Sequence, residues 1–377
     1  MEDTGGFEQL LRTWDGELVA VRHDGHTATW MFVGVHSTAL GPGFGGTRMK
    51  PYPRPAEALW DVLRLSEAMT LKNSLAGIPF GGGKAVLAVP ELPSGPARRE
   101  LLLRYADLVA SLRGTYVTAA DMNTGAADMD VIGERTEHVL GRSPERGGSG
   151  EPSPATARGV FHAIRAAVRH AFGSDDLAGR SVLVQGVGAV GGRLADLLAE
   201  AGAKVLVSDL DPDRARRAAE RVEGVEVPTD DAIGADCDVF APCAAGGVLS
   251  AETIPRLRCR VVAGAANNQL LEPADAERLR DAGILYAPDF VVNAGGVLSL
   301  AGLEVLGWTP EHLEERLRGI GDTLLRVFAL AEEEGITTDA AARRLAEERI
   351  AAARAGQGAA APDGRSKPRA LGPRGAS

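Results

Sequence analysis

Apolar positions in the first part of the chain change from strand-like to helix-like spacing. Segments Glu17–Arg22 and Thr29–Val35 run apolar or alternate on either side of the turn-like His23–His26, which predicts a β-hairpin. A glycine-rich segment follows, and we predict it to be a loop. From Pro55 to Ala76, apolar residues recur at helical spacing with proline in the first turn, which predicts a helix with one buried face formed by Leu59, Val62, Leu63 and Met69.

The next segments continue this mixture of strands and helices. Ala85–Val89 reads as a strand, Ala97–Leu112 as a helix and Thr115–Thr118 as a strand that ends in the polar run Asp121–Thr124. Arg142–Pro154 is rich in Gly, Ser and Pro and is typical of a connection between domains. We therefore predict an N-terminal α/β domain over residues 1–148.

Strands and helices alternate regularly in the second half of the chain. After a helical pattern over Thr156–Phe172, a strand ends at Gln185, a helix runs through Leu198, a strand covers Lys204–Ser208 and a helix follows Pro212. Short strands are expected near Val239, Val261 and Leu285. This order predicts a doubly wound parallel sheet of the Rossmann type over residues 149–325.

The end of the chain changes character twice. Pro310–Ala352 is long, charged and helical in pattern, and we assign residues 326–356 to a C-terminal helical segment. Residues 357–377 are rich in Gly, Pro, Arg and Ala, which predicts a disordered tail. We find no internal repeat.

Length and composition restrict the class of protein. A chain of 377 residues suggests two domains, and 45% hydrophobic with 24% charged residues is typical of globular proteins. A net charge of −10 argues against a nucleic-acid partner, and no segment has the pattern of a signal peptide or membrane span. The 3 cysteines lack metal-ligand spacing, so we expect reduced core residues, no metal and a cytoplasmic location.

A glycine fingerprint lies between the first strand and helix of the second domain. In Gly186-Val187-Gly188-Ala189-Val190-Gly191, the first glycine permits a tight turn, the second lets the backbone approach a pyrophosphate and the third allows close packing. The phosphates would lie at the helix N-terminus. Asp209 closes the next strand, where a carboxylate binds the adenosine ribose and repels a 2′-phosphate, so we expect NAD rather than NADP, although Arg214 could soften the preference.

Two lysines in the first domain stand in apolar or glycine-rich surroundings. Lys72 is near the end of the predicted helix, and Lys84 lies between glycines and a strand. Each taken alone is more often an ordinary surface charge, but desolvation or a neighbouring cation lowers the pKa of lysine, which then becomes a base. Asp121 follows a strand and supplies a carboxylate for proton exchange. Together these residues indicate a catalytic site.

Eight motifs around these residues resemble those of the Glu/Leu/Phe/Val dehydrogenase family, in particular its leucine and valine dehydrogenases. They run in order over most of residues 15–350 and are highly specific as a set. The motifs are Leu40–Arg48, Met69–Asn73, Gly81–Val86, Tyr116–Asp121, Asp128–Asp130, Gly147–Gly150, Ala263–Leu270 and Ala287–Gly296.

The resemblance implies NAD-dependent interconversion of an L-amino acid with its 2-oxo acid and ammonia, in a cleft between the domains. Lys72 would bind the substrate carboxylate, Lys84 would activate the attacking water and Asp121 would exchange the proton of the amino group. Gly45 and Gly46 would let the backbone approach the substrate. Contacts to cofactor and substrate from the second domain would come from Thr156, Ala265, Asn267 and Asn293. The family also implies homo-oligomers, dimers or octamers built through the N-terminal domain.

The resemblance also places a side-chain pocket, formed by Phe44, Met69, Ala119, Val297 and Leu300. Leucine dehydrogenases typically carry leucine where this chain has Phe44, valine where it has Leu300 and glycine where it has Asn123, while Ala120 stands where an acidic residue is common. The larger side chains leave less room, which favours valine or a smaller aliphatic substrate, with overlapping use of leucine, isoleucine and 2-aminobutyrate.

Two alternatives share the same fold. An aromatic, phenylalanine-type dehydrogenase would use the same catalytic residues and differ only in the pocket, where Ala119 and Phe44 count against it. A catalytically silent NAD-binding regulatory protein would lack Lys72, Lys84 or Asp121, and this chain carries all of them. Assays with a panel of 2-oxo acids separate these possibilities.

Overall fold

The computed structural model describes residues 11–359, which divide into two compact units. Unit 1 contains the chain up to Glu151, the segment Leu300–Gly307 and the chain from Ala346 onward. Unit 2 contains Pro152–Ser299 and Trp308–Leu345. The first division lies close to the predicted boundary at residue 148. The later divisions return the chain to unit 1 at Leu300–Gly307 and again from Ala346, whereas the sequence predicted an uninterrupted second domain. Composition gives no signal for such a short segment that belongs to a unit formed by residues far away in the sequence.

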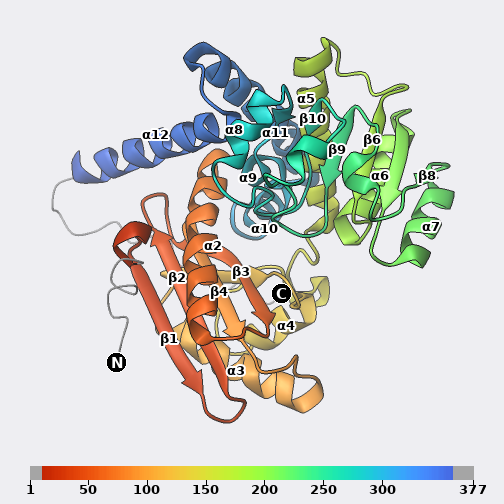
Figure 1. The fold of residues 1–377 in the computed structure, drawn as a ribbon. Coiled ribbons are helices and arrows are strands. Elements are labelled where there is room, and N and C mark those ends of the chain that lie inside the picture. Colours follow the sequence, from red (N-terminus) through yellow and green to blue (C-terminus); the bar gives the residue numbers. More distant parts are fainter. Residues whose placement is uncertain (1–10, 360–377) are drawn as a thin grey trace. The chain divides into compact units, whose positions relative to one another are not determined.

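Unit 1 is built on a mixed five-stranded sheet with the order β1-β2-β4-β3-β5. Its strands are β1 (Leu18–Asp24), β2 (Thr29–Ser37), β3 (Gly43–Lys50), β4 (Gly81–Ala88) and β5 (Tyr116–Ala120). Strands β1, β2 and β4 are antiparallel, and β4, β3 and β5 are parallel. The β1–β2 pair, with Leu18 opposite Val35, confirms the predicted hairpin (Figure 1).

The prediction of a loop for the glycine-rich segment is wrong. Gly43–Lys50 forms strand β3 between β4 and β5. A Cβ on Gly45 would lie 1.9 Å from the carbonyl oxygen of Gly83, so the two backbones pass too closely for a side chain. Glycines lack the side-chain alternation by which a strand is recognised in a sequence, and this central strand was therefore missed.

Helices cover both faces of this sheet. Helix α2 (Pro55–Leu75) packs on one face in an apolar cluster of Trp14, Phe32, Ala58, Val62, Leu63, Val86 and Ala88. Helices α3 (Gly95–Ser111) and α4 (Ala126–Ile132) cover the other face, around Met31, Val33, Leu87 and Tyr105. Because strand residues alternate between faces, Lys84 shares the α2 face with Val86 and Ala88.

Unit 2 contains a six-stranded parallel sheet with the order β11-β10-β9-β6-β7-β8. The strands are β6 (Ser181–Gln185), β7 (Lys204–Ser208), β8 (Val225–Glu226), β9 (Val239–Pro242), β10 (Val261–Val262) and β11 (Leu285–Tyr286). The direction of strand addition reverses between β6 and β9. This confirms the predicted doubly wound sheet, in which ligands bind beyond the carboxyl ends of the strands at the reversal.

The helices of the second half of the chain lie before, between and after these strands in the sequence (Figure 1). They are α5 (Ser153–Phe172), α6 (Ala189–Glu200), α7 (Pro212–Arg221), α8 (Asp275–Asp281), α9 (Asp289–Val292), α10 (Gly295–Leu300), α11 (Pro310–Glu334) and α12 (Thr338–Ala359). A π-helical turn at Ala301–Val305 follows α10, and single 3₁₀ turns occur at Pro144–Arg146, Ala232–Gly234 and Ile254–Arg256.

The predicted long helix Pro310–Ala352 is two helices. Gly335 ends α11 with a φ of +65°, a left-handed conformation that glycine adopts readily and that stops an α-helix. Helix α12 then begins at Thr338, and its residues from Ala346 onward belong to unit 1. Of the predicted tail, residues 357–359 end α12, and residues 360–377 lie outside the described part of the chain.

Candidate active site

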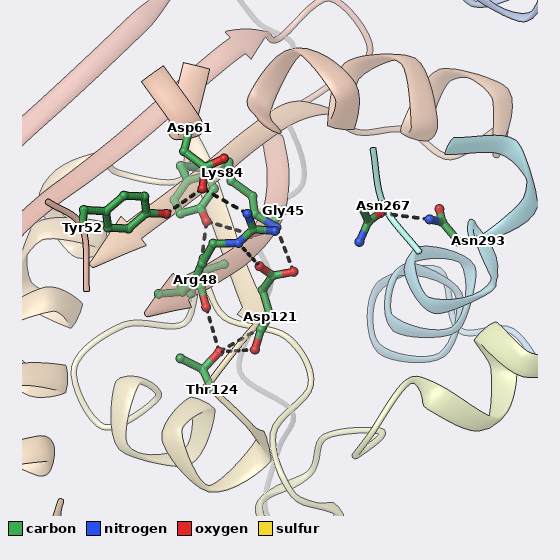
Figure 2. A network of polar contacts seen from close by, with 12 residues as sticks. Gly45, Arg48, Tyr52, Asp61, Lys84, Asp121, Thr124, Asn267 and Asn293 are labelled. Carbon is green, nitrogen blue, oxygen red and sulfur yellow. Dashed lines mark hydrogen bonds and ion pairs between the residues drawn. The ribbon is translucent and has the colours of Figure 1, made fainter. Parts of the chain in front are cut away.

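Lys84 and Asp121 form a buried ion pair in unit 1. The Lys84 Nζ lies 3.1 Å from Asp121 Oδ1, and Lys84 is only 5% exposed. Lys84 is fixed by strand β4, while Asp121 directly follows β5 (Figure 2). The Asp121 N–H donates to Thr124 Oγ1 at 2.9 Å, and that hydroxyl donates to the carbonyl of Thr47 at 2.7 Å, which fixes the turn that carries the carboxylate.

A second cation holds the other oxygen of Asp121. Arg48, on β3, donates from Nε to Asp121 Oδ2 at 3.0 Å and from an Nη to Asp61 Oδ2, also at 3.0 Å. Asp61 lies on α2, accepts a 2.6 Å hydrogen bond from Tyr52 and pairs with Arg64 at 3.3 Å. Figure 2 shows the Arg48 guanidinium between the two carboxylates. Both carboxylates are therefore charge-compensated inside the protein.

These contacts perturb the titration of the pair in opposite ways. Burial lowers the pKa of Lys84, and the positive charge of Arg48 acts in the same direction, while Asp121 opposes it. Burial alone would raise the pKa of Asp121, but Lys84 and Arg48 outweigh it and hold that pKa far below its usual range. Lys84 can therefore lose a proton more readily than an ordinary lysine, while Asp121 remains a carboxylate.

Lys72 is also buried, at 8% exposure, near the end of α2, which packs against β4. The positive charge of Arg48 is one of the causes that lower the pKa of Lys84, and an effect of Lys72 on that pKa stays a prediction. Close backbone packing leaves no room for a side chain at Gly45 or at Gly46. A Cβ on Gly46 would lie 2.5 Å from the carbonyl oxygen of Ala120 and 2.8 Å from Asp121 Cβ.

The residues predicted for the side-chain pocket are mostly buried. Phe44 is 1% exposed, with its ring centroid 5.1 Å from that of Phe80, and Met69 and Ala119 are buried in the same unit. Leu300 belongs to unit 1 as well, and its Cδ2 lies 3.3 Å from the position of a Cβ on Gly141. Val297 is half-buried on α10 and belongs to unit 2.

Asn123 and Ala120, the two residues near Asp121 that depart from the family pattern, both lie beside strand β3. Asn123 adopts a φ of +60°, in the left-handed region, where asparagine is tolerated better than most residues. Glycine, which leucine dehydrogenases typically carry at this position, also suits that conformation. Its side-chain amide donates to the carbonyl of Met49 at 2.9 Å. Ala120 ends β5 opposite Thr47. The Asn123 side chain is thus engaged with the backbone of β3.

The glycine fingerprint of unit 2 forms an open helix N-terminus. Gly186 has a φ of +92°, and a Cβ on Gly191 would lie 1.9 Å from the Gly186 carbonyl oxygen, so both are required by the turn. A Cβ on Gly188 would meet no atom within 4 Å, and Gly188, the N-cap residue of α6, offers no side-chain cap. The absence of a side chain at Gly188 keeps this space open in front of backbone N–H groups, which suits a phosphate.

A cavity of about 580 Å³ adjoins this turn and fits part of a dinucleotide. Its lining includes Gly186, Gly188, Asp209 and Arg214. Asp209 accepts hydrogen bonds from the backbone N–H groups of Val187 and Asp211, both at 2.9 Å, and Arg214 pairs with Asp209 at 3.1 Å. Arg214 also pairs with Asp211 at 3.4 Å, so the carboxylates outnumber the guanidinium beside the cavity.

Asn293 offers a further polar group for a cofactor in unit 2. Its amide donates to Asn267 Oδ1 at 2.9 Å and to the carbonyl of Ala265 at 3.1 Å (Figure 2). Its own Oδ1 is buried without a hydrogen-bond partner in the structure. A buried acceptor of this kind is costly unless a ligand or water pairs with it. Thr156, in the first turn of α5, donates to the carbonyl of Pro152 at 3.0 Å.

Sequence reasoning missed Arg48, Asp61 and Tyr52 as members of the site. Arg48 ends the glycine-rich motif Leu40–Arg48, and the motif alone assigns it no role. A signal was present, since an arginine inside a glycine-rich, apolar segment is seldom buried without a carboxylate partner. The identity of that partner was not readable, because Asp61 and Asp121 come from different elements.

Comparison with known proteins places these residues in a known sequence family. Residues 18–138 match the family model described as Glu/Leu/Phe/Val dehydrogenase, dimerisation domain. Residues 147–213 and 212–358 match the model described as Glutamate/Leucine/Phenylalanine/Valine dehydrogenase. Together the matches cover both units.

Individual relatives are similar over nearly their whole length. Leucine dehydrogenase of Geobacillus stearothermophilus is 43% identical over 91% of this chain and 92% of its own, and valine dehydrogenase of Streptomyces albus is 46% identical over 94% of each. The crystal structure of L-tryptophan dehydrogenase from Nostoc punctiforme has a TM-score of 0.78 and 39% identity, and the alignment covers 93% of this chain and 99% of that one.

Proposed function

Because this chain belongs to the Glu/Leu/Phe/Val dehydrogenase family, we propose that it oxidatively deaminates a small, branched-chain or shorter aliphatic L-amino acid and catalyses the reverse reductive amination. The observation that carries this proposal is the buried Lys84–Asp121 pair, in which a lysine of lowered pKa contacts a carboxylate at 3.1 Å. A silent regulatory protein would have no need to keep this costly arrangement.

The proposed roles follow from the chemistry of each group. Lys84, when neutral, accepts a proton from the water that attacks the imino carbon. Asp121 exchanges the proton of the substrate amino group, and Lys72 binds the substrate carboxylate as its counter-ion. When bound, the nicotinamide accepts hydride from the substrate α-carbon. Arg48 and Lys84 keep Asp121 ionised, so that it is ready to accept a proton at the start of deamination.

We propose NAD as the preferred cofactor. The first glycine turn and the N-terminus of α6 would hold the pyrophosphate, and Asp209 would accept hydrogen bonds from the adenosine ribose. A 2′-phosphate would face the carboxylates of Asp209 and Asp211, both of which pair with the single guanidinium of Arg214. Asn293, with its unpaired Oδ1, and Asn267 would contact the nicotinamide end or the substrate.

The proposed substrate preference is valine or a smaller amino acid. Phe44 is enclosed and packs on Phe80, so rotation of its ring would disturb a buried aromatic contact worth about 0.5–1.5 kcal/mol beyond its area. Phe44 and the longer Leu300 thus restrict volume where leucine dehydrogenases carry smaller residues. Overlapping activity on leucine, isoleucine and 2-aminobutyrate is expected, since one methylene discriminates by only about 1–3 kcal/mol.

A panel assay tests this function directly. Reductive amination is followed as oxidation of NADH or NADPH with ammonia and 2-oxo acids from pyruvate to indolepyruvate, with Lys84→Ala as the blank. We expect the highest kcat/KM with 2-oxoisovalerate or 2-oxobutyrate and NADH. No turnover with any 2-oxo acid in the wild-type protein would overturn the proposal.

A second candidate is an aromatic amino-acid dehydrogenase. The observation that favours it is the 39% identity to L-tryptophan dehydrogenase from Nostoc punctiforme. If the chain has this second function, the Phe44 ring would provide a face against which an aromatic substrate stacks. Higher kcat/KM for phenylpyruvate or indolepyruvate than for 2-oxoisovalerate in the same panel would select it and leave the proposed catalytic residues unchanged.

We also propose a homo-oligomer, a dimer or octamer, located in the cytoplasm. The family description of residues 18–138 as a dimerisation domain supports assembly through unit 1. Cys237, Cys243 and Cys259 are free thiols, which suits a reducing compartment. Among residues 11–359, helices long and apolar enough to span a bilayer are absent. Light scattering of the purified protein measures the subunit number.

A further inference from the structure

The two oxygens of the Asp121 carboxylate contact two different cations. Lys84 contacts Oδ1 at 3.1 Å, and Arg48 Nε contacts Oδ2 at 3.0 Å. The same guanidinium reaches Asp61 Oδ2 at 3.0 Å. Arg48 is therefore bound at two separate nitrogens by two acids from different elements, a geometry that a planar guanidinium provides and a lysine ammonium does not.

We propose that Arg48 is a positioning residue that binds Asp121 Oδ2, orients the carboxylate and leaves Oδ1 for Lys84 and for the substrate amino group. Asp61 fixes Arg48 from the α2 side by accepting a 3.0 Å hydrogen bond from its guanidinium. Tyr52 in turn holds Asp61 by donating a 2.6 Å hydrogen bond to the same carboxylate. This inference rests on the proposed catalytic roles of Lys84 and Asp121.

The geometry explains why Lys84 contacts one oxygen of the Asp121 carboxylate and not both. A carboxylate with a free second oxygen could rotate and take Lys84 as a bidentate partner, which would keep the lysine protonated. With Oδ2 fixed by Arg48 and the backbone fixed through Thr124, only one oxygen faces Lys84. The arrangement leaves the lysine bound but able to release its proton.

The charges around Lys84 predict the direction in which its pKa changes when Arg48 or Asp61 is substituted. Asp121 and Asp61 raise the pKa of Lys84, and Arg48 lowers it. The packed elements also carry Lys72, which is buried on α2, and His36, which is half-buried on β2 and whose Nδ1 forms a 2.9 Å hydrogen bond with Thr70 Oγ1. Removal of the Arg48 charge should thus raise the pKa of Lys84, whereas removal of the Asp61 charge should lower it.

The test compares Arg48→Gln, Arg48→Lys and Asp61→Asn in the full-length protein. We expect kcat for deamination to fall on the order of 10- to 100-fold in Arg48→Gln, because the reacting carboxylate is misplaced, with a smaller change in the substrate KM. The acid limb of the kcat/KM profile should move to higher pH in Arg48→Gln and to lower pH in Asp61→Asn. Arg48→Lys, which keeps the charge but not the two-sided contact, should lose kcat with little change in the profile.

Arg104→Gln is the matched control. Arg104 donates to the buried Asp24 at 3.1 Å in the same unit, so its loss breaks an ion pair that includes none of these groups. We expect lower thermal stability and an unchanged pH profile.

The outcomes separate this inference from the proposed function. If Lys84→Ala is inactive but all three variants of Arg48 and Asp61 keep wild-type kcat and pH profiles, the role of Arg48 is refuted. Profiles that move in the same direction for Arg48→Gln and Asp61→Asn also refute it. If Lys84→Ala itself retains near-normal kcat, the proposed function fails first. Should Arg48→Gln not fold, Arg48→Lys and Asp61→Asn still decide the question.

Discussion

Two glycines of the fingerprint, Gly188 and Gly191, should respond in opposite ways to the same substitution. A Cβ on Gly188 meets no protein atom within 4 Å, and its φ of −72° lies outside the left-handed region that favours glycine. A Cβ on Gly191 would lie 1.9 Å from the Gly186 carbonyl oxygen, whereas real Cβ atoms stay beyond 3.0 Å. Gly188→Ala therefore tests ligand space, and Gly191→Ala tests packing.

The structure sets the magnitudes of both effects. In Gly191→Ala the turn and helix α6 must separate by more than an ångström, an overpacking that costs about 1–3 kcal/mol or more. Gly188→Ala replaces the N-cap glycine of α6 by alanine, which costs about 1 kcal/mol or less. If a phosphate oxygen occupies the space of the new Cβ and one charge-assisted hydrogen bond is lost, roughly 1.5–3 kcal/mol of binding disappears, or about 10- to 100-fold in Kd.

Thermal unfolding without cofactor and fluorescence titration with NADH measure the two effects separately. We expect Gly188→Ala to unfold near the wild-type temperature and to bind NADH much more weakly. Gly191→Ala should unfold several degrees lower even without cofactor. Wild-type NADH affinity in a folded Gly188→Ala variant would refute the assignment of this turn to the pyrophosphate, because the added methyl group would then lie outside the cofactor site.

Four further substitutions test the remaining assignments. Lys84→Ala should abolish turnover while NADH still binds, whereas Lys72→Ala should chiefly raise the substrate KM because the carboxylate loses its counter-ion; steady-state kinetics separates them, and a Lys84 variant with near-normal kcat contradicts the mechanism. Asp209→Ala should narrow the preference for NAD over NADP, and equal kcat/KM with both cofactors in the wild-type protein would remove Asp209 from that role. Phe44→Leu should shift preference from valine toward leucine on the order of 10-fold in kcat/KM, and an unchanged ratio would show that the ring lies outside the pocket.

The pH dependence of deamination should follow Lys84. Its pKa is lowered by burial and by Arg48, so the neutral form is present at lower pH than for an exposed lysine. Because the neutral amine acts as the base, kcat/KM should rise with pH through this lowered pKa and then level off. Asp121 stays ionised over the same range and contributes no limb.

The sequence alone determined the features that depend on neighbouring residues. The strand, the glycine turn and the helix around Gly186–Gly191 follow one another along the chain, so their periodicity and spacing predicted the parallel sheet and its phosphate-binding turn. The linked motifs likewise identified Lys84 and Asp121 and the family to which they belong. In each case the information lies within a short stretch, where local rules apply.

Only the tertiary structure decided how distant residues share charge and space. Strand β3 was read as a loop because its glycines serve contacts with Gly83 and Ala120, which are remote in sequence. Arg48, on strand β3, had no predicted role because its partners Asp61 and Asp121 lie on helix α2 and after strand β5. A buried charge is tolerated only where partners from several elements meet, and that meeting is a property of packing rather than of any local pattern.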